Sequence, residues 1–171
     1  MACVQCLGSL GDGSCPGAAC RAGFLREVVR PTTRLVEIRY NGDMGYGVFV
    51  QPNKTINKNT LLDVYLGEVV PPCTERLSAY QFAITLSRSG LIANVDAKAY
   101  GNWTRFVNSH CEPNVDATIE ALGGQLVVAF IANQDIPAGE QLFINYGRSY
   151  FEAQDINCIC DGQDKPHLPP N

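Results

Sequence analysis

Short segments that alternate apolar and polar residues recur along the chain, separated by Gly, Pro and Asn. Residues 35–40 alternate as a half-buried strand does, and the turn signal Asn41-Gly42-Asp43 precedes a second such segment at 46–50. The same character recurs at 61–70, 80–86, 91–96, 115–122, 125–132 and 141–145, with hairpin turns expected at Ser89-Gly90 and Gly123-Gly124. At most one helical turn is indicated, at 74–79. The sequence therefore predicts a mainly β fold of several small sheets with little helix.

One segment does not fit this pattern. Residues 102–114 contain the asparagines Asn102, Asn108 and Asn114, together with an arginine, a histidine, a cysteine and two aromatic residues. Asparagine is disfavoured in strands and in helix interiors because its amide competes for backbone hydrogen bonds. The segment is therefore either a polar loop between two elements or a stretch that contacts a ligand.

Length, charge and hydropathy restrict the class of protein. A chain of 171 residues with 46% hydrophobic and 18% charged residues supports one domain with a sizeable core. Its net charge of −4 and pI near 5.1 argue against a direct nucleic-acid site, which needs clustered Lys and Arg, and suit a basic partner. No apolar run reaches the roughly 18 residues of a membrane span, and the N-terminus lacks the pattern of a secretory signal.

The eight cysteines are unevenly distributed. Without a secretory signal they are expected to be reduced, as thiols or metal ligands. Cys3, Cys6, Cys15 and Cys20 lie in a Gly-rich segment, Cys158 and Cys160 lie near the end, and Cys73 and Cys111 stand alone. The first four could form one tetrahedral zinc site, which would order a segment that has no core of its own. The alternative is an arm with unligated thiols.

Several motifs occur in an order that resembles a known family. They are Gly45-Tyr-Gly47, Tyr65-Leu-Gly-Glu68, Asn102-x2-Arg-Phe-x-Asn108 with Cys111-x-Pro-Asn114, Gly139-Glu-Gln-Leu142 and Asn145-Tyr-Gly147. Together they resemble SET domains, protein-lysine methyltransferases that use S-adenosylmethionine, over residues 34–160. The resemblance implies a β-clip-like SET fold in which the 102–114 segment and the last strand are interthreaded as a C-terminal pseudoknot. It also implies a cysteine-rich pre-SET-like segment at 1–24, the SET domain at 25–150 and a post-SET-like tail at 151–171.

The matched positions imply the residues of an active site. Tyr146 is expected to be the central catalytic residue and Tyr80 the second tyrosine of a channel for the substrate lysine, which Phe82 and Ile144 also line. Cofactor binding is expected from Gly45, Tyr46, Gly47, Arg105, Phe106, Asn108 and Ser109. Gly45 and Gly47 would let backbone amides approach the carboxylate of the cofactor, and Arg105 and Phe106 would brace the turn.

The chemistry explains why tyrosines suit such a site. Methyl transfer is an in-line displacement, so the amine must be aligned with the methyl–sulfur bond. The lysine, whose ordinary pKa is about 10.4, must also lose its proton, and an apolar channel beside a cationic sulfonium disfavours the ammonium form. The Tyr146 hydroxyl can hold the amine without acting as a strong base, and aromatic walls suit the lysine stem and its head.

Cys111 and the pair Cys158-x-Cys160 resemble the post-SET zinc site. The family's fourth cysteine is absent, because Lys165 stands at its position. His167 is a candidate substitute, since zinc accepts imidazole. A site with three ligands, or no site, is the alternative.

Two other positions depart from the family's pattern. Ser109-His110 stands where His-Ser is usual. Serine is tolerated if the backbone at 109 makes the adenine contact, whereas cofactor affinity falls if packing of the imidazole matters. Ile144 stands where Phe or Tyr is usual. Because Ile has no hydroxyl to hold the water that favours monomethylation, a multiply methylated product is expected.

The sequence therefore predicts a protein-lysine N-methyltransferase that uses S-adenosylmethionine and acts on a histone tail, bound as an added strand. Lysine 9 of histone H3 is the favoured target, from the similarity of residues 26–38 to a pre-SET join. Zinc is the second expected cofactor, a monomer is expected, and the expected location is nuclear chromatin, with the cytoplasm as the alternative. The alternative function is a catalytically silent SET module that binds a peptide or protein partner.

Overall fold

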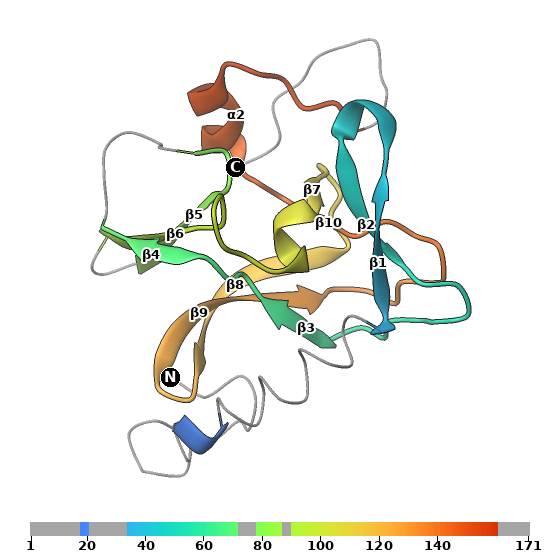
Figure 1. The fold of residues 1–171 in the computed structure, drawn as a ribbon, viewed down its shortest axis with the longest axis horizontal. Coiled ribbons are helices and arrows are strands. Elements are labelled where there is room, and N and C mark those ends of the chain that lie inside the picture. Colours follow the sequence, from blue (N-terminus) through green and yellow to red (C-terminus); the bar gives the residue numbers. More distant parts are fainter. Residues whose placement is uncertain (1–17, 21–33, 72–77, 87–89, 161–171) are drawn as a thin grey trace.

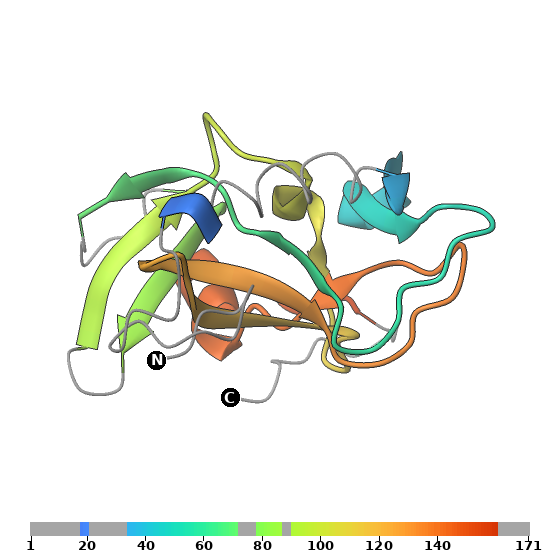
Figure 2. The ribbon, with the colours of Figure 1, turned by 90° about the horizontal axis from the view of Figure 1, so that it is seen from below.

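The computed structural model describes residues 18–20, 34–71, 78–86 and 90–160. Within these ranges the chain forms four small sheets, short 3-10 turns and one labelled α-helix, α2 (Arg148–Gln154). Figures 1 and 2 show the hairpin of β1 and β2 and the sheet of β4, β5 and β6 at opposite ends of the molecule, with β8 and β9 between them. The prediction of a mainly β fold with little helix is confirmed.

The first two strands form an antiparallel hairpin. β1 (Val36–Tyr40) pairs with β2 (Tyr46–Val50), and the 3-10 turn η2 (Gly42–Met44) connects them at the predicted turn signal. Gly45 ends this turn with φ of 71°, a backbone conformation that glycine adopts readily and residues with a Cβ rarely adopt. This turn therefore sets where β2 begins, and β2 lies against residues 103–106.

The largest sheet has the strand order β3-β9-β8. β8 (Val115–Leu122) and β9 (Gln125–Ala132) form a hairpin whose glycines, Gly123 and Gly124, both have positive φ, which confirms the predicted turn. β3 (Leu61–Val64) pairs with the other edge of β9. The Cys20 side chain is buried against Val64 and Leu122 of this sheet. Cys3, Cys6 and Cys15 lie outside the described residues.

The prediction of one strand over 61–70 was wrong. The chain leaves β3 at Val64 and joins a different sheet as β4 (Glu68–Val70), whose order is β4-β6-β5 with β5 (Gln81–Leu86) and β6 (Gly90–Asp96). At the break, Gly67 packs so closely on the backbone of Asp96 that a Cβ would lie 2.5 Å from the Asp96 carbonyl oxygen. The predicted pairing of 80–86 with 91–96 is confirmed, while the connecting turn and residues 74–77 of the expected helical turn lie outside the described residues.

The last strand pairs with the polar segment rather than with its neighbours in sequence. β10 (Phe143–Ile144) runs parallel to β7 (Asn108–Ser109), and the His110 amide donates to the Ile144 carbonyl at 3.0 Å. This pairing brings residues 102–114 beside the C-terminal segment, as the resemblance implied. α2 follows at once and was not predicted.

The core lies between these sheets. Its largest fully buried side chains come from β2, β3, β8, β9 and the connecting segments: Phe130, Ile56, Leu62, Leu122, Ile136, Leu142, Val48, Val50, Val107, Val115 and Val128. None of the helices in the described ranges is long and apolar enough to cross a membrane.

Two glycines give a matched stability prediction. Gly67→Ala is expected to cost about 2 kcal/mol or more of unfolding free energy, because the new Cβ would meet Asp96 and Ala97 backbone that cannot move without separating β4 from β6. Gly47→Ala should cost roughly 1 kcal/mol, because its Cβ would meet side chains alone: the flexible end of Gln141, 2.5 Å away, and the edge of the Phe49 ring, 3.2 Å away. Urea unfolding of both variants measures this order, and equal losses would contradict it.

Candidate active site

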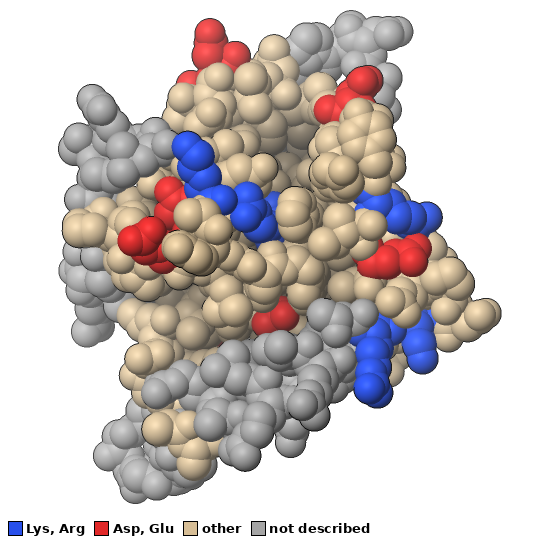
Figure 3. All heavy atoms as spheres, in the orientation of Figure 1, with Lys and Arg blue, Asp and Glu red and all other residues tan. Residues whose placement is uncertain are grey.

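A pocket of about 490 Å³ lies between the start of β2, the start of β5, the 3-10 turn η3 (Trp103–Phe106) and α2. Most of the residues that the sequence assigned to the active site line it: Gly45, Tyr46, Tyr80, Phe82, Arg105, Phe106, Asn108, Ile144 and Tyr146. Ser109 lines an adjoining pocket of about 180 Å³, and Gly47 lines neither of these two. On the face that Figure 3 draws, the Lys and Arg side chains stand in separate small groups rather than as one basic surface.

Tyr146 follows β10 and borders both pockets. Its hydroxyl donates to the Val107 carbonyl oxygen at 2.8 Å, and its ring centroid lies 4.6 Å from that of Tyr150 on α2. Loss of solvent around the phenol raises the pKa of Tyr146 well above its ordinary value, with smaller contributions from the neighbouring tyrosines. The hydroxyl is therefore neutral, and its oxygen can still accept a hydrogen bond from a donor in the pocket.

Tyr65 occupies the break between β3 and β4 and also lines the larger pocket. Its hydroxyl donates to the Tyr80 carbonyl oxygen at 2.7 Å, and its ring packs against Phe82 and Phe130. Burial raises the pKa of Tyr65 well above its ordinary value. Tyr65 and Tyr146 therefore have the same arrangement, in which each phenol donates to a backbone carbonyl and keeps its lone pairs.

Arg105 links η3 to the start of β5. Its guanidinium carbon lies 4.5 Å from the centroid of the Tyr80 ring and 5.4 Å from that of Phe106. These are cation–π distances, so the arginine holds Tyr80 at the pocket wall and leaves one cation there. No aspartate or glutamate is among the described residues that line this pocket.

The glycines at the start of β2 have structural causes that do not involve a ligand. Gly45 is required by its positive φ, and a Cβ there would meet nothing within 4 Å. At Gly47 a Cβ would instead displace the Gln141 amide, whose oxygen accepts from the Asn41 side chain at 2.8 Å. The expected approach of a cofactor to these amides stays a prediction.

The β7 segment accounts for the Ser109-His110 order. The Ser109 hydroxyl accepts from the Tyr146 amide at 3.2 Å, while His110 accepts from the Glu112 amide at 2.9 Å and packs against Phe143. The Asn108 side chain donates to the Tyr46 carbonyl at 3.2 Å. Serine thus supports the backbone of Tyr146, and the imidazole caps the turn that leads to Cys111.

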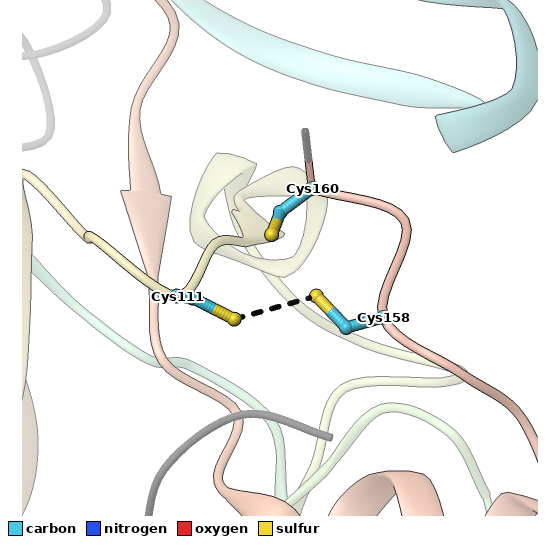
Figure 4. Close-up of side chains that lie close together, drawn as sticks. All are labelled: Cys111, Cys158 and Cys160. Carbon is cyan, nitrogen blue, oxygen red and sulfur yellow. Dashed lines mark hydrogen bonds between the residues drawn. The ribbon is translucent and has the colours of Figure 1, made fainter. Parts of the chain in front are cut away.

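Cys111, Cys158 and Cys160 come together beside the smaller pocket, which Cys158 lines. Figure 4 shows the three sulfurs directed toward one another; all lie within 4.8 Å, and those of Cys111 and Cys158 are 3.8 Å apart. With Zn–S bonds of about 2.3 Å, tetrahedral zinc places its sulfur ligands about 3.8 Å apart, so the three sulfurs fit zinc. Burial and the two neighbouring thiols raise the pKa of Cys111 to about 12, an effect that a bound dication would reverse.

The fourth ligand is not among the described residues that form this cluster. Lys165 and His167 lie outside the described ranges, and His110 is not part of the group although it precedes Cys111. Cys20 is buried against the β3-β9-β8 sheet. Zinc binding by Cys111, Cys158 and Cys160 therefore remains a proposal that the geometry of three sulfurs supports.

Sequence reasoning missed several residues of the pocket wall, namely Tyr65, Thr104, Val107 and Tyr150. Tyr65 stood in a quoted motif, Tyr65-Leu-Gly-Glu68, and could have been found there. Thr104 and Val107 fill the spacer positions of the 102–108 motif, so their types carried no signal. Tyr150 depends on α2, which the sequence did not predict.

Comparisons with known proteins point to one family. The SET domain family model matches residues 35–147, about two thirds of the chain. The chain is 29% identical to human histone-lysine N-methyltransferase EHMT1 over 82% of its own length, and 27% identical to mouse histone-lysine N-methyltransferase NSD3 over 95%. It is also 27% identical over 85% to a histone-lysine N-methyltransferase of Cryptococcus neoformans named as specific for H3 lysine 36.

These matches cover only 11% of the two mammalian relatives and 18% of the fungal one, so the chain spans a small part of their length. The match to the family model is not affected by this difference, because it includes most of the segments that form the pocket, from the β1–β2 hairpin to the Asn145-Tyr-Gly147 motif, and ends just before α2. The chain belongs to the SET domain family.

Proposed function

We propose that this chain is a protein-lysine N-methyltransferase that uses S-adenosylmethionine and acts on a basic peptide such as a histone tail. One observation carries the proposal: Tyr146 has a neutral hydroxyl that donates a hydrogen bond to the Val107 carbonyl, and it lies in a pocket lined by aromatic rings. The similarity to relatives named as histone-lysine N-methyltransferases supports the same class.

The pocket suits a lysine side chain entering from the peptide side. Tyr65, Tyr80 and Phe82 provide aromatic walls for the methylene stem, and the Tyr146 oxygen can accept from the amine. S-adenosylmethionine, when bound, supplies an electrophilic methyl group on a cationic sulfonium. The residues of this chain align the amine and exclude water, while Asn108 and Ser109 line the adjoining pocket.

The absence of a carboxylate from the described pocket wall decides where the lysine proton goes. Because no aspartate or glutamate stands there as a general base, the lysine must enter as the neutral amine or lose its proton to water. The Arg105 cation and the apolar walls both disfavour the ammonium form. Tyr146 then orients the free base rather than removing the proton.

The edge of β5 suits the peptide itself. β5 pairs only with β6 among the described strands, and Gln81, Phe82 and Ala83 at its start line the pocket. An extended peptide added at this edge would place one lysine at the pocket mouth. A histone tail is basic and the chain is acidic overall, which favours the encounter.

The finer assignments belong to the same proposal. Lysine 9 of histone H3 is the favoured target, although one relative is named for lysine 36. Multiple methylation is expected because buried Ile144 offers no hydroxyl beside Tyr146. Location on nuclear chromatin and a monomeric state complete the proposal.

Label transfer tests it directly. The protein is incubated with methyl-labelled S-adenosylmethionine and histone H3 tail peptides, each carrying a single free lysine with the others replaced by arginine. Label on at least one peptide, with the lysine 9 peptide preferred, is the expected result. Cofactor binding without transfer to any peptide or to core histones would favour the silent module instead.

The pH dependence follows from the same groups. For the lysine peptide, kcat/KM should rise about tenfold per pH unit from 7 to 9, because the neutral amine fraction grows while free lysine has a pKa near 10.4. Burial raises the pKa of Tyr146, so its hydroxyl stays protonated over this range and no falling limb appears. Initial rates between pH 6.5 and 9.5 measure the profile, and a maximum near neutral pH would contradict a base-free pocket.

A further inference from the structure

Asp63 is a buried carboxyl group in the middle of β3, with 3% of its surface exposed. One oxygen accepts from the Trp103 indole N–H at 2.8 Å, and the other accepts from the Val64 amide at 2.8 Å. The Asn102 side chain gives the same carboxyl a further hydrogen bond and donates to the Val64 carbonyl at 2.9 Å. All these partners are donors, which is the bonding pattern of an ionised carboxylate.

No cation among the described residues pairs with this carboxylate. The ion pair that the described part of the chain forms lies elsewhere, between Arg39 and Glu37. Burial raises the pKa of Asp63, which reflects the cost of keeping a charge in the core, and the hydrogen bonds from Val64, Trp103 and Asn102 oppose that cost. The carboxylate is therefore held by one strand and by the first residues of the η3 turn.

The η3 turn transmits this contact to the pocket. The Thr104 hydroxyl, which is buried, donates to the Asn102 side-chain oxygen at 2.5 Å. The Val107 amide donates to the Thr104 carbonyl at 3.1 Å, and the Val107 carbonyl accepts the Tyr146 hydroxyl. A continuous chain of hydrogen bonds thus joins Asp63, which does not line the pocket, to Tyr146, which does.

We propose that Asp63 is a positioning residue, which through Trp103 and Asn102 fixes the η3 turn and so sets where Val107 and Asn108 stand in the pocket. Packing alone would be served as well by an apolar pair, since burying a charge and an indole N–H carries a desolvation cost. Directional hydrogen bonds define the position of a turn more narrowly than apolar contacts do. The proposal rests on the proposed function for its catalytic reading, but its structural part does not.

The test uses Asp63→Asn and Trp103→Phe, singly and together, with Ile136→Val as the control. Ile136 is fully buried and does not line the pocket. Ile136→Val is therefore expected to lower stability and to leave the pocket unchanged. The dissociation constant of S-adenosylhomocysteine is measured by calorimetry and methyl transfer by initial rates, both below the melting temperature of every variant. Asp63→Asn is expected to weaken binding of S-adenosylhomocysteine about tenfold, because the new side-chain NH2 would face the Trp103 N–H or the Val64 amide, which are themselves donors.

The double variant decides the route. If the Asp63–Trp103 hydrogen bond is responsible for the effect, the double variant should bind S-adenosylhomocysteine no more weakly than whichever single variant binds it less well. Additive losses, or a loss in Asp63→Asn no greater than that in Ile136→Val, would overturn the proposal. If Asp63→Asn does not fold, Trp103→Phe alone makes the same comparison with Ile136→Val.

Failure of the proposed function remains distinguishable. If the wild-type protein binds neither S-adenosylmethionine nor its product, the proposed function fails. Trp103 is the one tryptophan of the chain, so its emission reports the turn without any ligand. A red shift in Asp63→Asn supports the positioning of the turn, and an unchanged spectrum overturns it.

Discussion

Replacing Tyr146 with phenylalanine is expected to lower kcat for methyl transfer by about 10²–10³-fold, the usual effect of removing one preorganised polar group from a reacting centre. The ring and its contact with Tyr150 remain, so the pocket keeps its shape. What is lost is the hydroxyl that donates to the Val107 carbonyl at 2.8 Å and whose oxygen is proposed to accept from the amine. Single-turnover rates with a saturating lysine peptide measure the chemical step.

The specificity of this effect needs two controls. Binding of S-adenosylhomocysteine to Tyr146→Phe should stay within about twofold of the wild type, because uniform binding is separate from transition-state stabilisation. Tyr100→Phe removes a hydroxyl from a residue that is 75% exposed and lines neither described pocket, so it should leave the rate unchanged. A Tyr146→Phe variant that retains wild-type kcat would remove Tyr146 from the catalytic role.

The β elements were predictable where the pattern of side chains is local. Alternation marked β1 and β2, and Gly123-Gly124 marked the β8–β9 hairpin, because a positive φ at both turn positions leaves a sequence signal. The break between β3 and β4 left none. The Tyr65 amide still donates to the Val128 carbonyl of β9, while the Tyr65 hydroxyl donates to the Tyr80 carbonyl and Gly67 packs on the backbone of Asp96. These contacts are distant in sequence, so no local pattern marks the break.

The candidate site was predictable from motif order rather than from any single residue type. Tyr146, Asn108 and Arg105 line one pocket because β7 and β10 pair across residues that are far apart in the chain. Spacing could not show that Asn108 donates to Tyr46, or that Gly47 makes room for Gln141. The role of Asp63 could not be predicted for the same reason. Its hydrogen-bond partner Trp103 is distant in sequence, so only the structure shows why a charged residue lies in this apolar strand.

Replacing Cys158 with serine is expected to abolish the zinc site and, with it, most cofactor binding. The reason is that residues 156–159 line the smaller pocket together with Asn108 and Ser109, two of the residues expected to bind the cofactor, and Cys158 ties this segment to the cysteine cluster. Structural zinc contributes of the order of 10 kcal/mol to the folding of small zinc modules, far more than one buried thiol contributes by packing. Metal analysis should find zinc on the wild-type protein and none at this site in the variant.

The same experiment separates metal from packing. A chelator should reproduce in the wild type the loss of S-adenosylhomocysteine binding seen in Cys158→Ser, and should add nothing in the variant. Cys73→Ser is the matched control, because the sequence places Cys73 in neither cysteine group, and it should retain both zinc and binding. If Cys158→Ser binds the ligand as the wild type does, the cluster of Cys111, Cys158 and Cys160 does not build the cofactor site. Wild-type protein that carries no zinc would reduce the three sulfurs to neighbouring thiols, and burial raises the pKa of Cys111 and of Cys158, so these two stay protonated at neutral pH.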